Sequence, residues 1–165
     1  MDFAKLFFSP VGRLNRKGYW VSSIALIIIV LILSAVLGVV FAFTGMANTV
    51  LGVKLLSLIT TLIMLPPIYF ISLKRLHDRE RPEVLALVFL APVTIDVILS
   101  MTSLTGTFVA QSVFGTQTIG FQPNKFGLVI DAITLGVGLW SLIELGFMRG
   151  QSGPNAHGPD PSEMG

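Results

Sequence analysis

The stretch that decides the fold is YWVSSIALIIIVLILSAVLGVVFAF, residues 19–43, which contains no charged side chain. A helix needs about 20 mostly apolar residues to cross the hydrocarbon core of a bilayer, and this run is longer than that. It also exceeds the apolar core of a secretory signal peptide, which is about 7–15 residues long. We therefore predict a membrane-spanning helix at residues 19–43.

Three further apolar runs follow, at residues 55–73, 84–104 and 126–148. In lipid such runs must be helical, because only a helix satisfies the backbone amides within its own segment. A membrane β-barrel is not expected, since its strands are about 10 residues long and alternate between apolar and polar. The sequence thus predicts an all-α integral membrane protein, a single domain with a bundle of four transmembrane helices and a tail at residues 149–165.

The composition is typical of a membrane protein. Of 165 residues, 53% are hydrophobic and 12% are charged, and the mean hydropathy is +0.81. Soluble domains carry about 25% charged residues, so this chain lacks the charge to cover a water-facing surface. The chain has no cysteine, which excludes disulfides and cysteine-based metal sites. We expect no nucleic-acid partner.

The placement of basic residues predicts which side faces the cytoplasm, where Lys and Arg concentrate in short loops. The segment before the first span, the second connection and the tail hold Lys5, Arg13, Arg16, Lys17, Lys74, Arg75, Arg79, Arg81 and Arg149. The other two connections hold only Lys54 and Lys125. Both termini should therefore be cytoplasmic. The outer segment 105–125 leaves two alternatives open, a small folded cap or a dip into the membrane interface.

The first residues of the chain predict a short helix. Phe3, Leu6 and Phe7 recur at helical spacing on one face, and Ser9 followed by Pro10 ends the pattern. An amphipathic helix next to a membrane span favours the interface between water and lipid. We therefore expect a short N-terminal interfacial helix.

Three acidic residues lie inside the predicted spans, namely Asp96, Asp131 and Glu144. A charged residue at the centre of a span costs roughly 2.5–3.5 kcal/mol on insertion scales, so such residues usually face the bundle interior or water. The helical rise places Asp96 and Asp131 nearly level. They could share a proton or accept Lys54 or Lys125, while Glu144 could reach the cytoplasmic interface. A structural role is favoured over a proton or ion path.

The connection KRLHDRERP, residues 74–82, reads as a tight charged turn between two spans. Lys74 and Arg75 suit the C-terminal end of a helix dipole, and Asp78 can pair with either of them. Pro82 suits the first turn of the next helix.

Metal and catalytic interpretations of this connection are weak. His77 and Asp78 could meet His157 and Asp160 of the tail, but their spacing matches no known zinc pattern. Adjacency of His and Asp in sequence does not establish the geometry of a catalytic triad. We expect no metal, no cofactor and no catalytic residue, and an enzymatic function is not favoured.

Three segments carry a resemblance to a known family: GRLNRKGYW at residues 12–20, SLKRLHDRERP at 72–82 and SGPNAHGPDP at 152–161. They are similar to the signature segments of the YhaH-like family, small bacterial inner-membrane proteins catalogued as domain of unknown function 805. The resemblance covers nearly the whole chain. It implies a multi-pass protein of the bacterial inner membrane and implies no activity.

All three segments fall on the predicted cytoplasmic side, so we predict a binding site there. Its basic members suit an anionic group, such as a phosphate-bearing membrane lipid or an acidic protein partner. This favours a non-enzymatic binding or scaffold protein, which could also form a homo-oligomer. The alternative is a small transporter or ion-coupled protein that uses Asp96 and Asp131. The predicted site consists of Arg13, Asn15, Arg16, Lys74, Arg75, His77, Asp78, Asn155 and Asp160.

Overall fold

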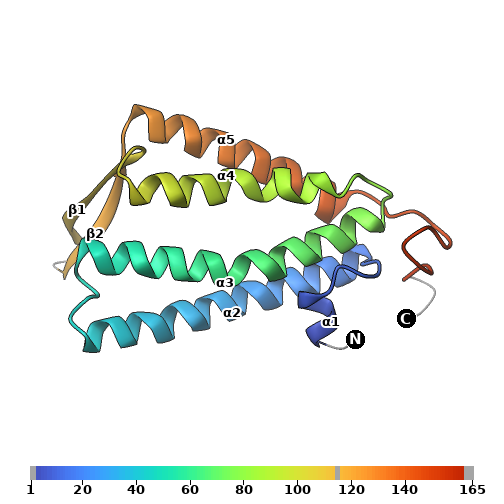
Figure 1. Cartoon of the computed structure of the whole chain (residues 1–165), viewed down its shortest axis with the longest axis horizontal. Helices are drawn as coiled ribbons and strands as arrows, with labels where there is room; N and C mark the ends of the chain where they lie inside the picture. Colours follow the sequence, from blue (N-terminus) through green and yellow to red (C-terminus); the bar gives the residue numbers. More distant parts are fainter. Residues whose placement is uncertain (1–2, 114–115, 162–165) are drawn as a thin grey trace. The chain divides into compact units, whose positions relative to one another are not determined.

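The structure is a computed structural model that describes residues 3–113 and 116–161. Its elements follow the chain in the order shown in Figure 1. They are α1 (Phe3–Phe8), α2 (Arg16–Phe43), α3 (Val50–His77), α4 (Val84–Met101), β1 (Gly106–Val113), β2 (Thr116–Pro123), α5 (Lys125–Ser141) and the π-helical turn η1 (Leu142–Phe147).

Four helices are long and apolar enough to cross a membrane, which confirms that part of the predicted fold. They are α2, α3, α4 and the continuous helix formed by α5 and η1. Only 6% of the most apolar window of α2 is buried within the protein, so its apolar side chains point outward, as a helix surrounded by lipid requires. Pro66 and Pro67 lie within α3, and Pro92 lies within α4.

The chain divides into two compact units, each of which contains part of every long helix. Unit 1 comprises Met1–Ile28, Met64–Ala91 and Gly136–Gly165, and unit 2 comprises Ile29–Ile63 and Pro92–Leu135. All nine basic residues assigned above to the cytoplasmic side belong to unit 1, and Lys54 and Lys125 belong to unit 2.

Unit 2 contains an antiparallel hairpin in segment 105–125, for which a small folded cap and a dip into the membrane interface were the two alternatives. β1 pairs with β2 from Gly106 opposite Pro123 to Val113 opposite Thr116. The protein is therefore mostly helical rather than all-α. The segment is rich in Thr, Val and Phe, which favour strands, but it is too polar to have been recognised as a span.

Hydrogen bonds connect the base of the hairpin to the start of α5. The Asn124 backbone N–H donates to the Thr105 carbonyl over 2.9 Å, and the Asn124 side chain accepts from the Gly127 backbone N–H over 2.9 Å. This is an N-cap, which satisfies one of the free amides at a helix start. A Cβ at Gly127 would overlap the Thr105 carbonyl oxygen, so only glycine permits this close approach.

Unit 1 has an apolar core built by the ends of several helices. Leu76 of α3, Ala86 and Phe89 of α4 and Leu145 of η1 are buried together. The short helix predicted near the N-terminus is present as α1, which ends at Phe8, and its Phe7 is buried.

Candidate functional site

The centre of unit 1 is a buried ion cluster in which Asp78 lies between two arginines. Arg75 pairs with Asp78 Oδ2, and Arg13 donates to Asp78 Oδ1 from Nε at 3.2 Å and from Nη2 at 3.1 Å. The side chains of Arg13, Arg75 and Asp78 are 1%, 0% and 5% exposed. Charges at such depth persist only when they are paired and fully hydrogen-bonded. We call these three residues the Arg–Asp–Arg cluster.

Burial and ion pairing act on Asp78 in opposite directions. Burial raises the pKa of its carboxyl above the ordinary value, because desolvation penalises the charged form. The guanidiniums of Arg75 and Arg13 oppose this rise by stabilising the carboxylate. The two arginines thus offset part of the cost of burying the charge.

The remaining donors of Arg75 bind backbone carbonyls of two other segments. Nη1 donates to Leu14 O at 3.3 Å, Nε donates to Leu145 O at 2.7 Å, and Nη2 donates to Met148 O. One planar guanidinium therefore connects the end of α3 to the N-terminal segment and to η1. A lysine has neither the number of donors nor the fixed fork to replace it.

Arg13 does the same for the tail, whose described part covers residues 149–161. Its Nη1 donates to Gly153 O at 2.6 Å and to Gly158 O at 3.3 Å, and its Nη2 donates to Gln151 O at 2.6 Å. The Gln151 backbone N–H in turn donates to Asp78 O at 2.8 Å. The tail is thus held by a residue far from it in sequence.

Lys74 contacts the N-terminal segment instead of Asp78. Asp78 was expected to pair with Lys74 or Arg75, and among the described residues it pairs with Arg75 but not with Lys74. The Lys74 ammonium instead donates to the carbonyls of Lys5 and Leu6, near the C-terminal end of α1. A cation at that end of a helix complements its dipole and its unpaired carbonyls.

His77 links the loop between α3 and α4 to both termini. Its Nδ1 lies 3.2 Å from the Gly12 carbonyl, and its Nε2 lies 3.0 Å from Glu83 Oε1. Its ring stacks on that of His157, with centroids 3.8 Å apart and planes 8° apart. The Asn155 side chain donates to the His77 carbonyl over 2.9 Å. His77 and Asn155 of the predicted site therefore meet.

Glu144 forms a second ion cluster, which is only partly buried. Its carboxylate pairs with Arg79 and lies 3.2 Å from Nε of Arg81, and its side chain is 13% exposed.

The π-helical turn η1 accepts hydrogen bonds at its backbone carbonyls. Trp20 Nε1 donates to the carbonyl of Gly146 over 3.1 Å. The wider turn of η1 leaves carbonyls without regular α-helical partners, and side chains from other elements bind them.

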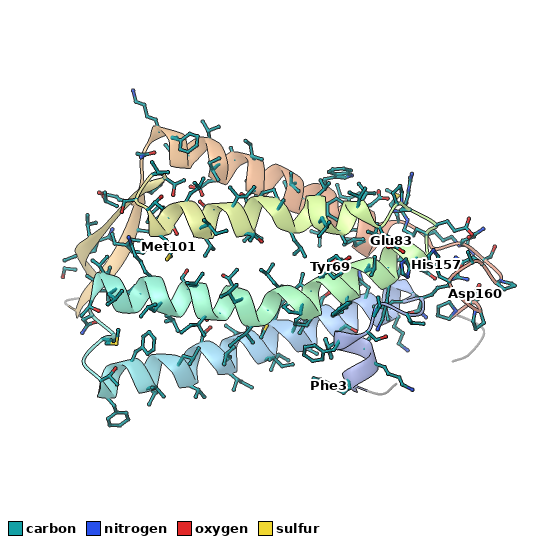
Figure 2. The ribbon with its side chains drawn as sticks, in the orientation of Figure 1. Phe3, Tyr69, Glu83, Met101, His157 and Asp160 are labelled. Atoms are coloured by element: carbon teal, nitrogen blue, oxygen red, sulfur yellow. The ribbon has the colours of Figure 1, made fainter. Side chains whose placement is uncertain are left out.

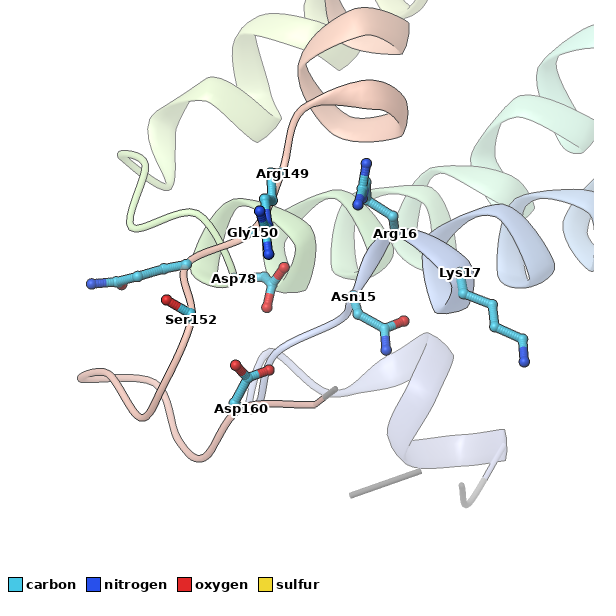
Figure 3. Close-up of a pocket in the computed structure, with 9 residues that line it drawn as sticks. Asn15, Arg16, Lys17, Asp78, Arg149, Gly150, Ser152 and Asp160 are labelled. Carbon is cyan, nitrogen blue, oxygen red and sulfur yellow. The ribbon is translucent and has the colours of Figure 1, made fainter. Parts of the chain in front are cut away.

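A cavity of about 290 Å³ lies beside the start of α2. We call it the α2 pocket. Figure 3 shows Asn15, Arg16 and Lys17 on its α2 side, opposite Asp78, Ser152 and Asp160. Arg149, Gly150 and Gln151 complete its lining. Four predicted site residues therefore share this cavity: Asn15, Arg16, Asp78 and Asp160.

The cations of the α2 pocket differ from those of the Arg–Asp–Arg cluster. Arg16, Lys17 and Arg149 are exposed, and none of them forms an ion pair within the described part of the chain. The Asn15 side chain caps α2 by accepting from the Gly18 backbone N–H over 2.8 Å. The positive end of the α2 dipole therefore adds to the charge of the three cations. Such an arrangement can bind an anion.

The other predicted residues lie elsewhere. Arg13 and Lys74 line a second cavity of about 370 Å³, together with Lys5 and His157. Arg75 lines neither of these two cavities, because its side chain is enclosed and its donors are used. The predicted site is thus divided between a buried framework and an exposed pocket.

Sequence reasoning did not select Lys17, Arg149 or Glu83 as site residues. Lys17 and Arg149 were used only to predict which side faces the cytoplasm, since each is a basic residue at the end of a span. No pattern pointed to Glu83, because its contact with His77 depends on how the loop turns at Glu80, where φ is 50°.

The intramembrane acids of unit 2 form a separate feature. Asp96 Oδ1 is buried and has no hydrogen-bond partner among the described residues, and Asp131 interacts electrostatically with Asp96. The Lys54 ammonium donates to the Met101 carbonyl over 2.8 Å instead of to either acid.

We predict that Asp78→Asn destabilises the protein by about 3–5 kcal/mol, because it leaves two buried guanidiniums without a counter-charge. The midpoint of thermal unfolding in detergent measures this loss. Glu80→Gln is the matched control, since Glu80 is an exposed acid of the same loop, and we expect a change within about 0.5 kcal/mol. Equal midpoints for Asp78→Asn and the parent would contradict a central role for the Arg–Asp–Arg cluster.

Comparison with known proteins adds a family and no activity. No curated protein and no solved structure matches the chain significantly. A family described as Protein of unknown function (DUF805) matches residues 7–159, which include the N-terminal segment, the α3–α4 loop and most of the tail. The chain belongs to the DUF805 family.

Proposed function

We propose that this protein is a non-enzymatic, multi-pass membrane protein that binds the phosphate of an anionic lipid headgroup in the α2 pocket. One observation carries the proposal: Arg16, Lys17 and Arg149 surround a cavity of about 290 Å³ and form no ion pair among the described residues. Cations that are not neutralised internally remain available to an external anion.

The position of the pocket favours a lipid as the source of the phosphate. Arg16 is the first residue of α2, a helix long and apolar enough to span a membrane, and headgroups lie at the level where spans end. Arginine binds phosphate through two parallel hydrogen bonds. Each Lys or Arg near an anionic leaflet contributes about 1 kcal/mol.

Both carboxylates of the α2 pocket have partners within the protein. Asp78 is neutralised by Arg75 and Arg13, and Asp160 accepts a hydrogen bond of 2.9 Å from the Gly153 backbone N–H. The Arg–Asp–Arg cluster therefore acts as a framework that holds the tail against the start of α2. This assigns a scaffolding role to Arg13 and Arg75 and a binding role to Arg16.

We further propose that unit 1 carries the cytoplasmic face, with both termini in the cytoplasm, α1 in the interface and the protein in the bacterial inner membrane. The excess of basic residues in unit 1, nine against two, supports this orientation.

A reporter enzyme that is active only outside the cytoplasm tests the orientation. Fused to the C-terminus, it should be inactive. Fused after Asn48, in the connection between α2 and α3, it should be active. The opposite pattern of activity would overturn the proposed orientation and, with it, the cytoplasmic placement of the α2 pocket.

Arg16→Ala and Arg149→Ala should each weaken retention of anionic lipid by about fivefold, which corresponds to the loss of about 1 kcal/mol per cation. Native mass spectrometry of the purified protein with phosphatidylglycerol measures this, with phosphatidylcholine as the neutral reference. Lys125→Ala removes an exposed cation from unit 2 and should leave retention unchanged. Variants of Arg16 and Arg149 that retain as much lipid as the parent would refute the pocket as the lipid site.

A second candidate function, a proton- or ion-coupled transporter, is supported by the unpartnered Asp96 oxygen and the nearby Asp131. An acid inside a span often marks a proton or ion path. If this function is correct, Asp96→Asn inserts normally but abolishes flux into proteoliposomes, measured with a pH-sensitive dye. Asp131→Asn should give the same loss. Unchanged flux, or no flux in the parent, would exclude the candidate.

A further inference from the structure

His77 faces two hydrogen-bond acceptors, although a neutral imidazole has only one N–H. A carbonyl only accepts, so the contact of 3.2 Å between Nδ1 and Gly12 O requires the proton on Nδ1. Nε2 then carries a lone pair, yet it lies 3.0 Å from the Glu83 carboxylate oxygen. Two acceptors at this distance require a proton or a metal ion between them.

We propose that His77 Nε2, Glu83 and His157 bind a divalent transition-metal ion, which ties the α3–α4 loop to the tail. The ligand atoms of these three residues all lie within 4.8 Å of one another. Figure 2 shows Glu83 and His157 close together, where the loop meets the tail. This set replaces the one considered from sequence, because Asp78 is engaged by arginines and Glu83 takes its place.

The surroundings of His77 match those of a metal ligand. Metal-binding histidines almost always donate their other ring N–H to a carbonyl, carboxylate or water, which sets the tautomer and the ring orientation. The Gly12 carbonyl does this for His77, whose side chain is only 5% exposed. The Glu83 side chain is 61% exposed, so an ion can reach the site from solvent.

The distances require a small adjustment of His157. Ligand atoms of one tetrahedral ion are about 3.4 Å apart when each metal–ligand bond is about 2.1 Å. The His77–Glu83 pair at 3.0 Å is already close to that spacing. The His157 ring lies parallel to His77 at 3.8 Å, so an ion in the plane of one ring is out of the plane of the other. His157 must therefore rotate its side chain to coordinate.

The backbone of the tail is already in position for this rotation. Asn155 and Gly158 exchange two backbone hydrogen bonds of 3.0 Å and 3.1 Å, which close a tight turn around His157. The Asn155 side chain accepts from the His157 backbone N–H and donates to the His77 carbonyl, each over 2.9 Å. Only side-chain torsions of His157 have to change.

The donor set indicates the class of ion. Two imidazoles and one carboxylate suit Zn²⁺ and its first-row neighbours, whereas Ca²⁺ and Mg²⁺ prefer oxygen ligands alone. Three protein ligands leave one tetrahedral position for water. The ion would therefore link His157 of the tail to His77 and Glu83 at the α3–α4 loop.

The test uses the full chain, purified in detergent with a histidine-free affinity tag and stripped with a chelator. Titration with Zn²⁺ alone should give one ion per chain, and Co²⁺ should give visible absorption bands of tetrahedral intensity. Glu83→Gln and His157→Phe should each weaken Zn²⁺ affinity by more than about tenfold. Replacing a residue that only contacts a metal ligand already weakens metal affinity by about 10–100-fold, and loss of a ligand itself should cost at least as much. His157→Phe keeps an aromatic ring for stacking on His77, and Glu83 is exposed, so both variants are expected to fold.

Glu80→Gln is the control, since it removes a carboxylate of the same loop that is not part of the ligand set. Its Zn²⁺ affinity should equal that of the parent. The proposal is overturned if the parent binds no Zn²⁺, in which case a proton shared between His77 and Glu83 accounts for their contact. It is also overturned if Glu83→Gln and His157→Phe bind as tightly as the parent. Neither variant alters the α2 pocket, so lipid retention is independent of this result.

Discussion

The buried contact of Asp78 with Arg75 and Arg13 is the interaction on which unit 1 depends. A carboxylate with 5% exposure would not persist without these two guanidiniums, and their remaining donors need carbonyls in return. The backbone of the N-terminal segment, of η1 and of the tail supplies those carbonyls. The ion pairs and hydrogen bonds of the Arg–Asp–Arg cluster therefore hold the N-terminal segment, η1 and the tail against the end of α3.

Much of the fold could be predicted from the sequence, because the constraints imposed by lipid are local. A run of about 20 apolar residues has to be helical whatever its neighbours are, so α2 and the other long helices were recognisable one at a time. The hairpin was not, because residues 106–123 are neither apolar enough for a span nor charged enough for an ordinary loop.

Several residues of the predicted set contact one another in unit 1, but the sequence did not predict which of them are buried. The signature segments contain Arg13, Arg75 and Asp78, which do meet, yet sequence could not tell a buried arginine from an exposed one such as Arg16. The pair of Arg75 and Asp78 could be predicted because the two residues are three positions apart on one helical turn. The pair of Arg13 and Asp78 could not, because these residues are 65 positions apart. Long-range contacts leave no periodic signal in a single sequence.

The position of the Arg–Asp–Arg cluster along the chain also constrains the order of assembly. Arg13 is synthesised before any span, but its acceptors at Gln151, Gly153 and Gly158 come after the last one. The cluster can acquire these contacts only after the last long helix and the tail have been synthesised. A chain that stops short of the tail would therefore be left with an arginine that lacks those carbonyls.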